Sequence, residues 1–155
     1  MTIEKFPQNI NKLDDGIFRT VNGNADEMIA VGRIMKAGFN CSRVDLSNSR
    51  YDAVIDIDGI LLRAQIKGTN QKNISLTGGG RSGKQIDKSV AQKTYKYTKN
   101  DCDVLIGIIS STAELYIIPI QALDSMPATS VSLDKIKQYR ENWKVLYDIA
   151  KDYKK

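Results

Sequence analysis

An acid, an amide and an amine stand close together in the stretch YDAVIDIDGILLRAQIKG, residues 51–68. Asp52 lies near its start, and Gln65 and Lys67 lie near its end. Carboxylate and amide oxygens are the ligands that a hard cation such as Mg²⁺ prefers. A lysine beside such a cation can stabilise a phosphorane-like transition state or help to generate hydroxide from water. These three side chains therefore point to metal-assisted chemistry on a phosphate ester, if the fold brings them together.

This stretch is expected to form a β-hairpin. Asp58-Gly59 between two alternating apolar runs is a strong signal for a two-residue type I′ turn, which fixes the register and places Asp52 opposite Gln65. Because side chains alternate across a strand, one face is wholly apolar and must pack on a core. That face carries Ala53, Ile55, Ile57, Ile60, Leu62, Ala64 and Ile66. The alternative interpretation is a half-exposed hairpin whose outer face is polar without any chemical role.

A helix is expected over residues 24–37, NADEMIAVGRIMKA, with Asn24 as its cap and Gly38 at its end. A step of 100° per residue places Glu27 near the middle of an apolar arc and Asp26 on the other side. The arc contains Met28, Ala30, Val31, Ile34 and Met35. A carboxylate on a buried face is costly unless it is paired or binds a metal, so Glu27 is a further candidate. The alternative is a first-turn glutamate that bends out to water.

A glycine-rich loop follows a short strand expected near residues 74–76. Gly78 to Lys84 matches the start of a phosphate-binding loop, GxxxxGK, but Gln85 stands where a hydroxyl residue should hold Mg²⁺. We therefore expect no nucleotide site here. A basic loop that contacts a phosphate backbone through Arg81 and Lys84 is the favoured interpretation, and a plain surface turn is the alternative.

Residues 88–99, KSVAQKTYKYTK, are expected to be helical, with a basic and aromatic edge. Lys93 and Lys96 on this edge are candidates for contacts to nucleic acid. A solvated face is the commoner explanation of such a pattern.

The composition excludes several kinds of site. The 155 residues include no histidine, which removes Ser-His-Asp and Cys-His catalysis and histidine zinc sites. Two cysteines make no disulfide framework, and no apolar run approaches a membrane span. The first residues lack the apolar core of a secretory signal, so we expect a cytoplasmic protein. A net charge of +5 favours a polyanionic partner, although weakly.

The remaining elements predict a central mixed sheet with helices against it, an α/β (α+β) architecture. Residues 1–23 are expected to form an arm, and residues 24–155 a single domain. The continuous apolar run over residues 104–109 indicates a strand that is buried on both faces. The other expected elements are a strand at 39–44, a strand that ends at Pro119, a helical turn at 121–124, a loop at 126–132 and a last helix at 133–153.

The order of these elements and the residues on them resemble the PD-(D/E)XK nuclease superfamily. In that superfamily a helix carries a glutamate, one strand carries an aspartate, and the next strand carries (D/E)xK. The matching residues here are Glu27, Asp52 and Gln65-Ile66-Lys67. Gln65 stands where an acid is usual, but a QxK variant occurs within the superfamily, in a small intron-encoded homing endonuclease of cyanobacteria. The resemblance extends over about residues 25–119.

The resemblance implies a restriction-endonuclease-like core and a role for each matching residue. Asp52 would be the main metal ligand, and Gln65 with the backbone carbonyl of Ile66 would complete the protein's ligands. Glu27 would bind the metal directly or through a water molecule. Lys67 would orient or activate the attacking water.

The activity implied is a Mg²⁺-dependent endonuclease, with Mn²⁺ able to substitute, that hydrolyses double-stranded DNA at a specific sequence in the manner of homing or restriction enzymes. Because cutting both strands needs two active sites, we expect a homodimer or homotetramer. The alternatives are a structure-specific nuclease such as a Holliday-junction resolvase, and a catalytically inactive DNA-binding protein of the same fold.

Overall fold

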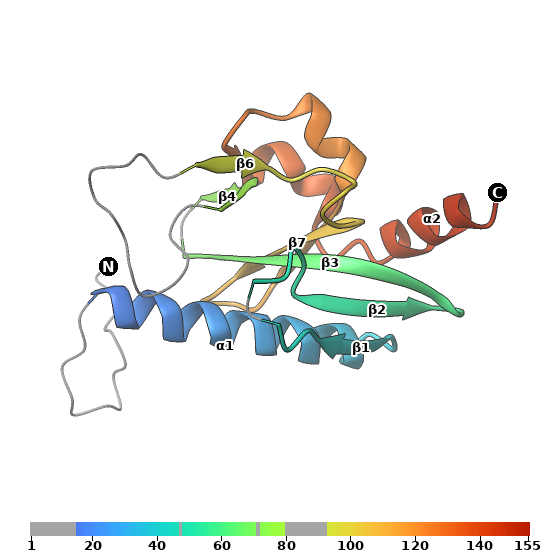
Figure 1. Cartoon of the computed structure of the whole chain (residues 1–155), viewed down its shortest axis with the longest axis horizontal. Helices are drawn as coiled ribbons and strands as arrows, with labels where there is room; N and C mark the ends of the chain where they lie inside the picture. Colours follow the sequence, from blue (N-terminus) through green and yellow to red (C-terminus); the bar gives the residue numbers. More distant parts are fainter. Residues whose placement is uncertain (1–14, 47, 71, 80–92) are drawn as a thin grey trace.

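The computed structural model describes residues 15–46, 48–70, 72–79 and 93–155 (Figure 1). Its centre is a five-stranded sheet with the strand order β1-β2-β3-β7-β8. The strands are β1 (Asn40–Arg43), β2 (Ala53–Ile57), β3 (Ile60–Thr69), β7 (Val104–Ile109) and β8 (Leu115–Pro119). β7 runs parallel to β3, whereas the other neighbours are antiparallel. The predicted central mixed sheet flanked by helices is confirmed.

The β2–β3 hairpin has the predicted register. Asp58 and Gly59 have φ angles of 52° and 86°, and two positive values are what a type I′ turn requires. Ile57 pairs with Ile60, and Ala53 pairs with Ala64. β3 continues beyond Ala64, where it pairs with β7 but no longer with β2. The far half of β3 therefore has one edge that β2 does not cover.

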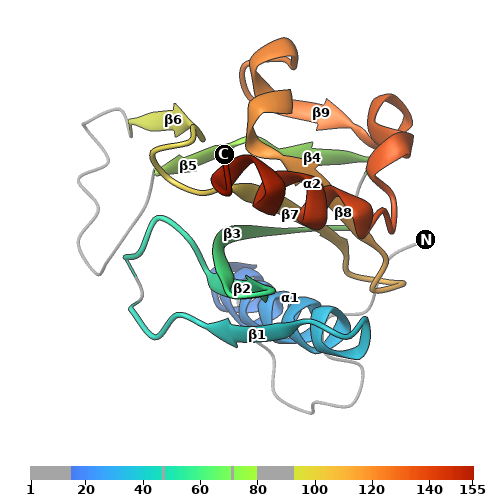
Figure 2. The ribbon, with the colours of Figure 1, turned by 90° about the vertical axis from the view of Figure 1, so that its right-hand side faces the viewer.

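Two helices cover one face of this sheet and form a first core with it. They are α1 (Asp15–Lys36) and α2 (Lys144–Tyr153). Figure 1 shows α1 running along the sheet, and Figure 2 shows α2 in front of β7 and β8. The helix residues buried in this core are Ala30, Val31, Ile34, Val145, Leu146, Ile149 and Ala150. β7 is buried from Val104 to Ile108, as expected for a strand covered on both faces.

A second core lies on the other face of the sheet, under short elements. β4 (Asn73–Ser75) pairs with β9 (Ser130–Ser132), and β5 (Thr77–Gly79) pairs with β6 (Thr94–Lys96). Two 3₁₀ helices, η1 (Ile120–Ser125) and η2 (Leu133–Tyr139), complete this layer. The second core includes Ile74, Leu76, Tyr97, Leu105, Tyr116, Ile118, Leu123 and Val131.

Two expectations for α1 are wrong. The helix begins at Asp15, so residues 15–23 of the expected arm are helical and Asn24 lies inside the helix. The buried face is also shifted from the expected one: Ala30, Val31 and Ile34 are buried as expected, but the edges of the arc differ. Asp26 is only 4% exposed, whereas Met28 and Met35 are 60% and 56% exposed. The buried residues Asp26, Ala30 and Ile34 follow one another at intervals of four. Asp26 can be buried because groups from other parts of the chain compensate its carboxylate, as described below.

Three further expectations after the hairpin are wrong. Residues 93–99 are not helical, since β6 pairs there with the glycine-rich strand β5. The expected loop at 126–132 contains β9, which pairs with β4. The expected single helix at 133–153 is divided into η2 and α2. Between them Glu141 takes a φ of 49°, donates its backbone N–H to Leu115 O and accepts the Leu115 N–H, and these contacts end the helix.

The start of the glycine-rich stretch, Gly78 and Gly79, lies in β5. Arg81 and Lys84, the predicted backbone contacts, lie outside the described residues, as do residues 88–92 of the expected helix. Within the described ranges, no helix is long and apolar enough to cross a membrane.

Candidate active site

Asp52 is fixed at the open end of the hairpin by two donors. Its Oδ2 accepts a hydrogen bond of 2.6 Å from Gln65 Nε2 and one of 2.8 Å from the Ile66 backbone N–H. Asp52 itself is held in line with the sheet, because its backbone N–H donates to Ala64 O at 2.8 Å. The predicted neighbours Asp52 and Gln65 are therefore brought together, and both of these hydrogen bonds go to Oδ2.

The length difference between β2 and β3 creates this site. Since β2 begins at Ala53, the edge of β3 beyond Ala64 is not paired with β2. The Ile66 N–H on this edge is satisfied by the Asp52 side chain. The Ile66 carbonyl is reached by Gln65 Nε2 at 3.3 Å, so it also faces the Asp52 side of the strand. A backbone carbonyl, an amide and a carboxylate thus converge at the end of the hairpin.

Lys67 lies on the same face of β3 as Gln65, partly buried against the second core. Its Nζ is 5.2 Å from the centroid of the Tyr97 ring. Burial lowers the pKa of its ammonium group, while the nearby charges of Asp52 and Glu27 act in the opposite direction. Lys67 and the two predicted carboxylates are therefore within electrostatic reach of one another.

Glu27 reaches this site from α1. Its Oε2 accepts a hydrogen bond of 3.1 Å from Arg43 Nη2, on β1. The pKa of Asp52 is raised to about 6, mainly by burial; the charge of Glu27 acts in the same direction, and the Ile66 N–H, Lys67 and Arg43 act against it. The Asp52 carboxyl is half-buried, hard to ionise and near a second carboxylate. A bound cation would stabilise its ionised form.

The donor set fits a hard divalent cation. Asp52 and Glu27 carry carboxylate oxygens and Ile66 a carbonyl, which are oxygen ligands that Mg²⁺ and Mn²⁺ accept. Gln65 turns its amide nitrogen toward Asp52 Oδ2 and the Ile66 carbonyl, so its oxygen would join these ligands only with the amide turned over. Within the described ranges no three Cys, His, Asp or Glu side chains gather as a metal site.

Sequence reasoning missed Asp26, which anchors α1 beside this site. The Ser110 hydroxyl donates to Asp26 Oδ2 at 2.6 Å. Burial raises the pKa of Asp26, and the Ser110 hydrogen bond acts against that rise. Gly68 leaves the room for this carboxylate, because a Cβ there would lie 2.0 Å from Asp26 Oδ2. A glycine inside a strand is a general signal that another group approaches the backbone closely, so Gly68 is the sequence feature that could have indicated this contact.

Gly68→Ala is therefore expected to destabilise the protein by about 1–3 kcal/mol, as overpacking does. Because Glu27 follows Asp26 on α1, Glu27 should be displaced from Asp52 as well. Gly32→Ala on the same helix is the matched control, since no atom lies within 4 Å of a Cβ there and alanine favours a helix. Urea unfolding of both variants measures the effect, and a Gly68→Ala protein as stable as Gly32→Ala would contradict it.

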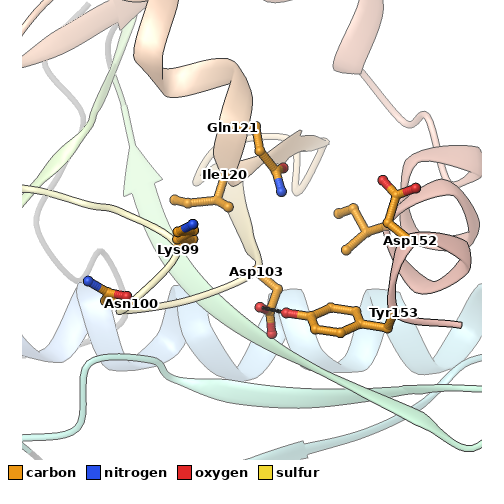
Figure 3. Close-up of a pocket in the computed structure, with 8 residues that line it drawn as sticks. Lys99, Asn100, Asp103, Ile120, Gln121, Asp152 and Tyr153 are labelled. Atoms are coloured by element: carbon orange, nitrogen blue, oxygen red, sulfur yellow. Dashed lines mark hydrogen bonds between the residues drawn. The ribbon is translucent and has the colours of Figure 1, made fainter. Parts of the chain in front are cut away.

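A cavity beside Asp103, just before the start of β7, is lined by other residues (Figure 3). Its one buried carboxylate, Asp103, accepts hydrogen bonds from Arg63 and from the Tyr153 hydroxyl. Burial acts to raise the pKa of Asp103, but these donors hold it below its ordinary value. Arg63 also donates to Lys99 O and Asn100 O. This cluster ties the end of α2 to the sheet and carries no free acid for catalysis.

The two described lysines predicted to contact DNA differ in their surroundings. Lys93 is exposed beside β6. Lys96 Nζ donates to Leu123 O at 2.5 Å and to Met126 O at 2.9 Å, which fixes β6 to the end of η1. Its ammonium group therefore has a structural role, and Lys93 remains the better candidate for a DNA contact.

Comparisons with known proteins agree with this geometry. The sequence model of the PD-(D/E)XK endonuclease family matches residues 19–154. The fold is similar to that of a bacterial homing endonuclease, I-Ssp6803I, with a TM-score of 0.68 and 21% identity over 88% of this chain and 97% of that one. It is also similar to Hjc, a Holliday junction resolvase of Archaeoglobus fulgidus, with a TM-score of 0.51 and 11% identity over 79% and 97% of the chains.

A search of curated proteins found no match. The family match spans most of the chain and includes α1, the β2–β3 hairpin and β7, the elements that position Glu27, Asp52, Gln65 and Lys67. This chain belongs to the PD-(D/E)XK endonuclease family.

Proposed function

We propose that this protein is a Mg²⁺-dependent endonuclease, active also with Mn²⁺, that cuts duplex DNA at a specific sequence. The observation that carries the proposal is the convergence of Asp52, Gln65 and the Ile66 carbonyl at the uncovered edge of β3, with Lys67 beside them. Members of this family generally use divalent metals. The homing endonuclease is the more similar of the two nucleases compared, and this favours recognition of a sequence over recognition of a DNA junction.

Each side chain has a distinct task in this proposal. Asp52, Glu27, Gln65 and the Ile66 carbonyl would hold the cation, which supplies Lewis-acid stabilisation of charge on the scissile phosphate. In the metal-free protein Gln65 donates its amide N–H to Asp52, and turning the amide over would present its oxygen to the cation. Lys67 would orient the attacking water and offset the negative charge that develops on the phosphate.

The proposal is tested by incubating plasmid and genomic DNA with the protein and Mg²⁺, Mn²⁺ or EDTA. Discrete fragments with either metal and none with EDTA are the expected result. Mapping the ends of the fragments gives the recognition site. Intact DNA at all metal concentrations, with a correctly folded protein, would refute the proposal.

A junction-resolving nuclease is the second candidate, since Hjc shares the fold. A synthetic four-way junction and a linear duplex of the same arm sequences separate the two functions. Cleavage of the junction alone, at positions independent of sequence, would favour a resolvase.

Gln65→Glu is expected to strengthen metal binding and weaken the metal-free protein. The new carboxylate adds charge for the cation, but it stands beside Asp52 and removes the N–H that Asp52 Oδ2 accepts. We expect roughly tenfold tighter Mn²⁺ binding by calorimetry and a lower melting temperature in EDTA. Gln121→Glu, the same change at an exposed position, is the control and should alter neither value. Unchanged Mn²⁺ affinity in Gln65→Glu would exclude Gln65 from the metal site.

Cutting both strands requires two active sites, so we infer that the protein acts as a homodimer or homotetramer. Light scattering of the protein on its DNA site should give at least twice the 17.3 kDa chain mass. A complex with a single chain that still makes double-strand breaks would contradict this inference.

A further inference from the structure

We infer that Tyr97 is a positioning residue that holds the Lys67 ammonium group in place beside Asp52. This inference rests on the proposed function, because it concerns the lysine that function requires. It adds a residue from the second core, outside the α1 helix and the β2–β3 hairpin that carry the predicted site.

The first observation is the contact itself. Lys67 Nζ lies over the Tyr97 ring at 5.2 Å from its centroid, within the range in which a cation is attracted by the negative face of an aromatic ring. Tyr97 is only 5% exposed. In such a partly desolvated setting this attraction is stronger than at the surface. The ring therefore offers the ammonium a fixed partner that carries no charge of its own.

The second observation is that Tyr97 has little freedom to move. Its backbone N–H donates to Leu76 O at 3.1 Å, and the preceding residue, Lys96, is fixed to two carbonyls at the end of η1. The Tyr95 ring packs edge-on against it at 5.6 Å. A Cβ at Gly78 would lie 2.5 Å from the Tyr97 hydroxyl oxygen, so the ring fills the space that this glycine leaves.

The third observation is the need for such a partner. Lys67 has a long flexible side chain, and the carboxylates of Asp52 and Glu27 both attract its ammonium group. An ammonium drawn fully onto Asp52 would occupy the oxygen that a cation needs. The Tyr97 ring gives the ammonium a second attraction, which keeps it near the reacting groups without direct pairing to the metal ligand.

The test compares Tyr97→Phe, which keeps the ring, with Tyr97→Leu, which removes it. We expect Tyr97→Phe to cleave DNA within about twofold of the original rate. Tyr97→Leu should lower kcat about tenfold or more and leave the KM for DNA within about twofold. Val131→Ala, a truncation in the same core, should lower stability without changing kcat. Equal kcat values for Tyr97→Leu and Tyr97→Phe would overturn the inference.

A double-mutant cycle measures the contact without any cleavage. Urea unfolding in EDTA is compared for the original protein, Tyr97→Leu, Lys67→Met and the double variant. Tyr97→Leu should raise the unfolding equilibrium constant of the original protein. If the ring holds the ammonium, the same substitution should raise that constant by a factor at least about threefold smaller in Lys67→Met. Additive effects would overturn the inference even if the protein is a nuclease.

The two measurements separate the possible failures. An original protein that does not cleave DNA refutes the proposed function and the positioning role, whatever the unfolding cycle gives. A cleaving protein whose kcat and cycle are both insensitive to the ring retains its proposed function and loses only the role of Tyr97.

Discussion

Asp52→Asn is expected to abolish DNA cleavage and, at the same time, to stabilise the metal-free protein at pH 8. The loss of cleavage follows because asparagine removes the negative charge of the main metal ligand, which the neutral Gln65 amide and Ile66 carbonyl do not replace. With several kcal/mol of transition-state stabilisation removed, the rate should fall by about 10³-fold or more. Asparagine keeps an oxygen that can accept the Gln65 and Ile66 N–H groups, so the local structure should persist.

The gain in stability follows from the raised pKa of Asp52. Its carboxyl has a pKa of about 6 in the folded chain, mainly because of burial, against an ordinary value near 4. Between these values the folded protein binds more protons than the unfolded chain, so stability falls as pH rises from 4 to 6 and stays lower above 6. This difference corresponds to roughly 3 kcal/mol, and Asp52→Asn should recover about 1–3 kcal/mol of it at pH 8.

Thermal unfolding in EDTA at pH 8 and pH 4.5 measures this effect. The melting temperature of Asp52→Asn should exceed that of the original protein by several degrees at pH 8, and the difference should shrink to roughly a third at pH 4.5. Asp58→Asn makes the same change at an exposed position of the same hairpin that tolerates a positive φ. It should change neither activity nor melting temperature appreciably.

Metal addition completes this prediction. Mg²⁺ should stabilise the original protein at pH 8 and have little effect on Asp52→Asn, since a ligand stabilises only the state that binds it. An Asp52→Asn protein that still cleaves DNA, or that is less stable than the original at pH 8, would contradict the role assigned to Asp52.

The hairpin and its chemistry could be predicted from sequence because their determinants are local. Asp58-Gly59 sets the turn, the turn sets the register, and the register brings Asp52 beside Gln65. The buried strand β7 could also be predicted, because its own residues are continuously apolar. In each case the information lies within a few residues of the structure that it determines.

The orientation of α1 could not be predicted, because its compensation lies far along the chain. A helical wheel places Asp26 outside, since a lone carboxylate belongs in water. The Ser110 hydroxyl and the space at Gly68 reverse that expectation, and both belong to other elements. The division of the last helix has the same kind of cause. Glu141 binds Leu115 on β8 and pairs with Arg33 on α1 at 2.5 Å.

Lys67→Met is expected to lower the cleavage rate by about 10²–10³-fold, the usual cost of losing one donor that stabilises developing charge. Methionine keeps the apolar stem in its contact with the second core, so the fold should persist. Binding of DNA in EDTA should change by only a few-fold, because one exposed or partly exposed cation among many contributes little to backbone affinity.

Lys99→Met is the matched control, since it removes the same charge from an exposed position. If Lys67 served only to attract DNA, both substitutions would raise the KM for DNA and leave kcat unchanged. If Lys67 acts on the reacting phosphate, Lys67→Met lowers kcat while Lys99→Met does not. Lys67→Arg separates charge from geometry, because guanidinium keeps the charge but not the compact ammonium group.

Stability gives a second means of recognising the role of Lys67. Burial lowers the pKa of its ammonium, so keeping this charge partly buried is unfavourable, and Lys67→Met should be at least as stable as the original protein in EDTA. A side chain whose removal destroys activity but not stability is kept for function. A large loss of stability in Lys67→Met together with normal cleavage by the folded fraction would show the opposite, that Lys67 serves the fold.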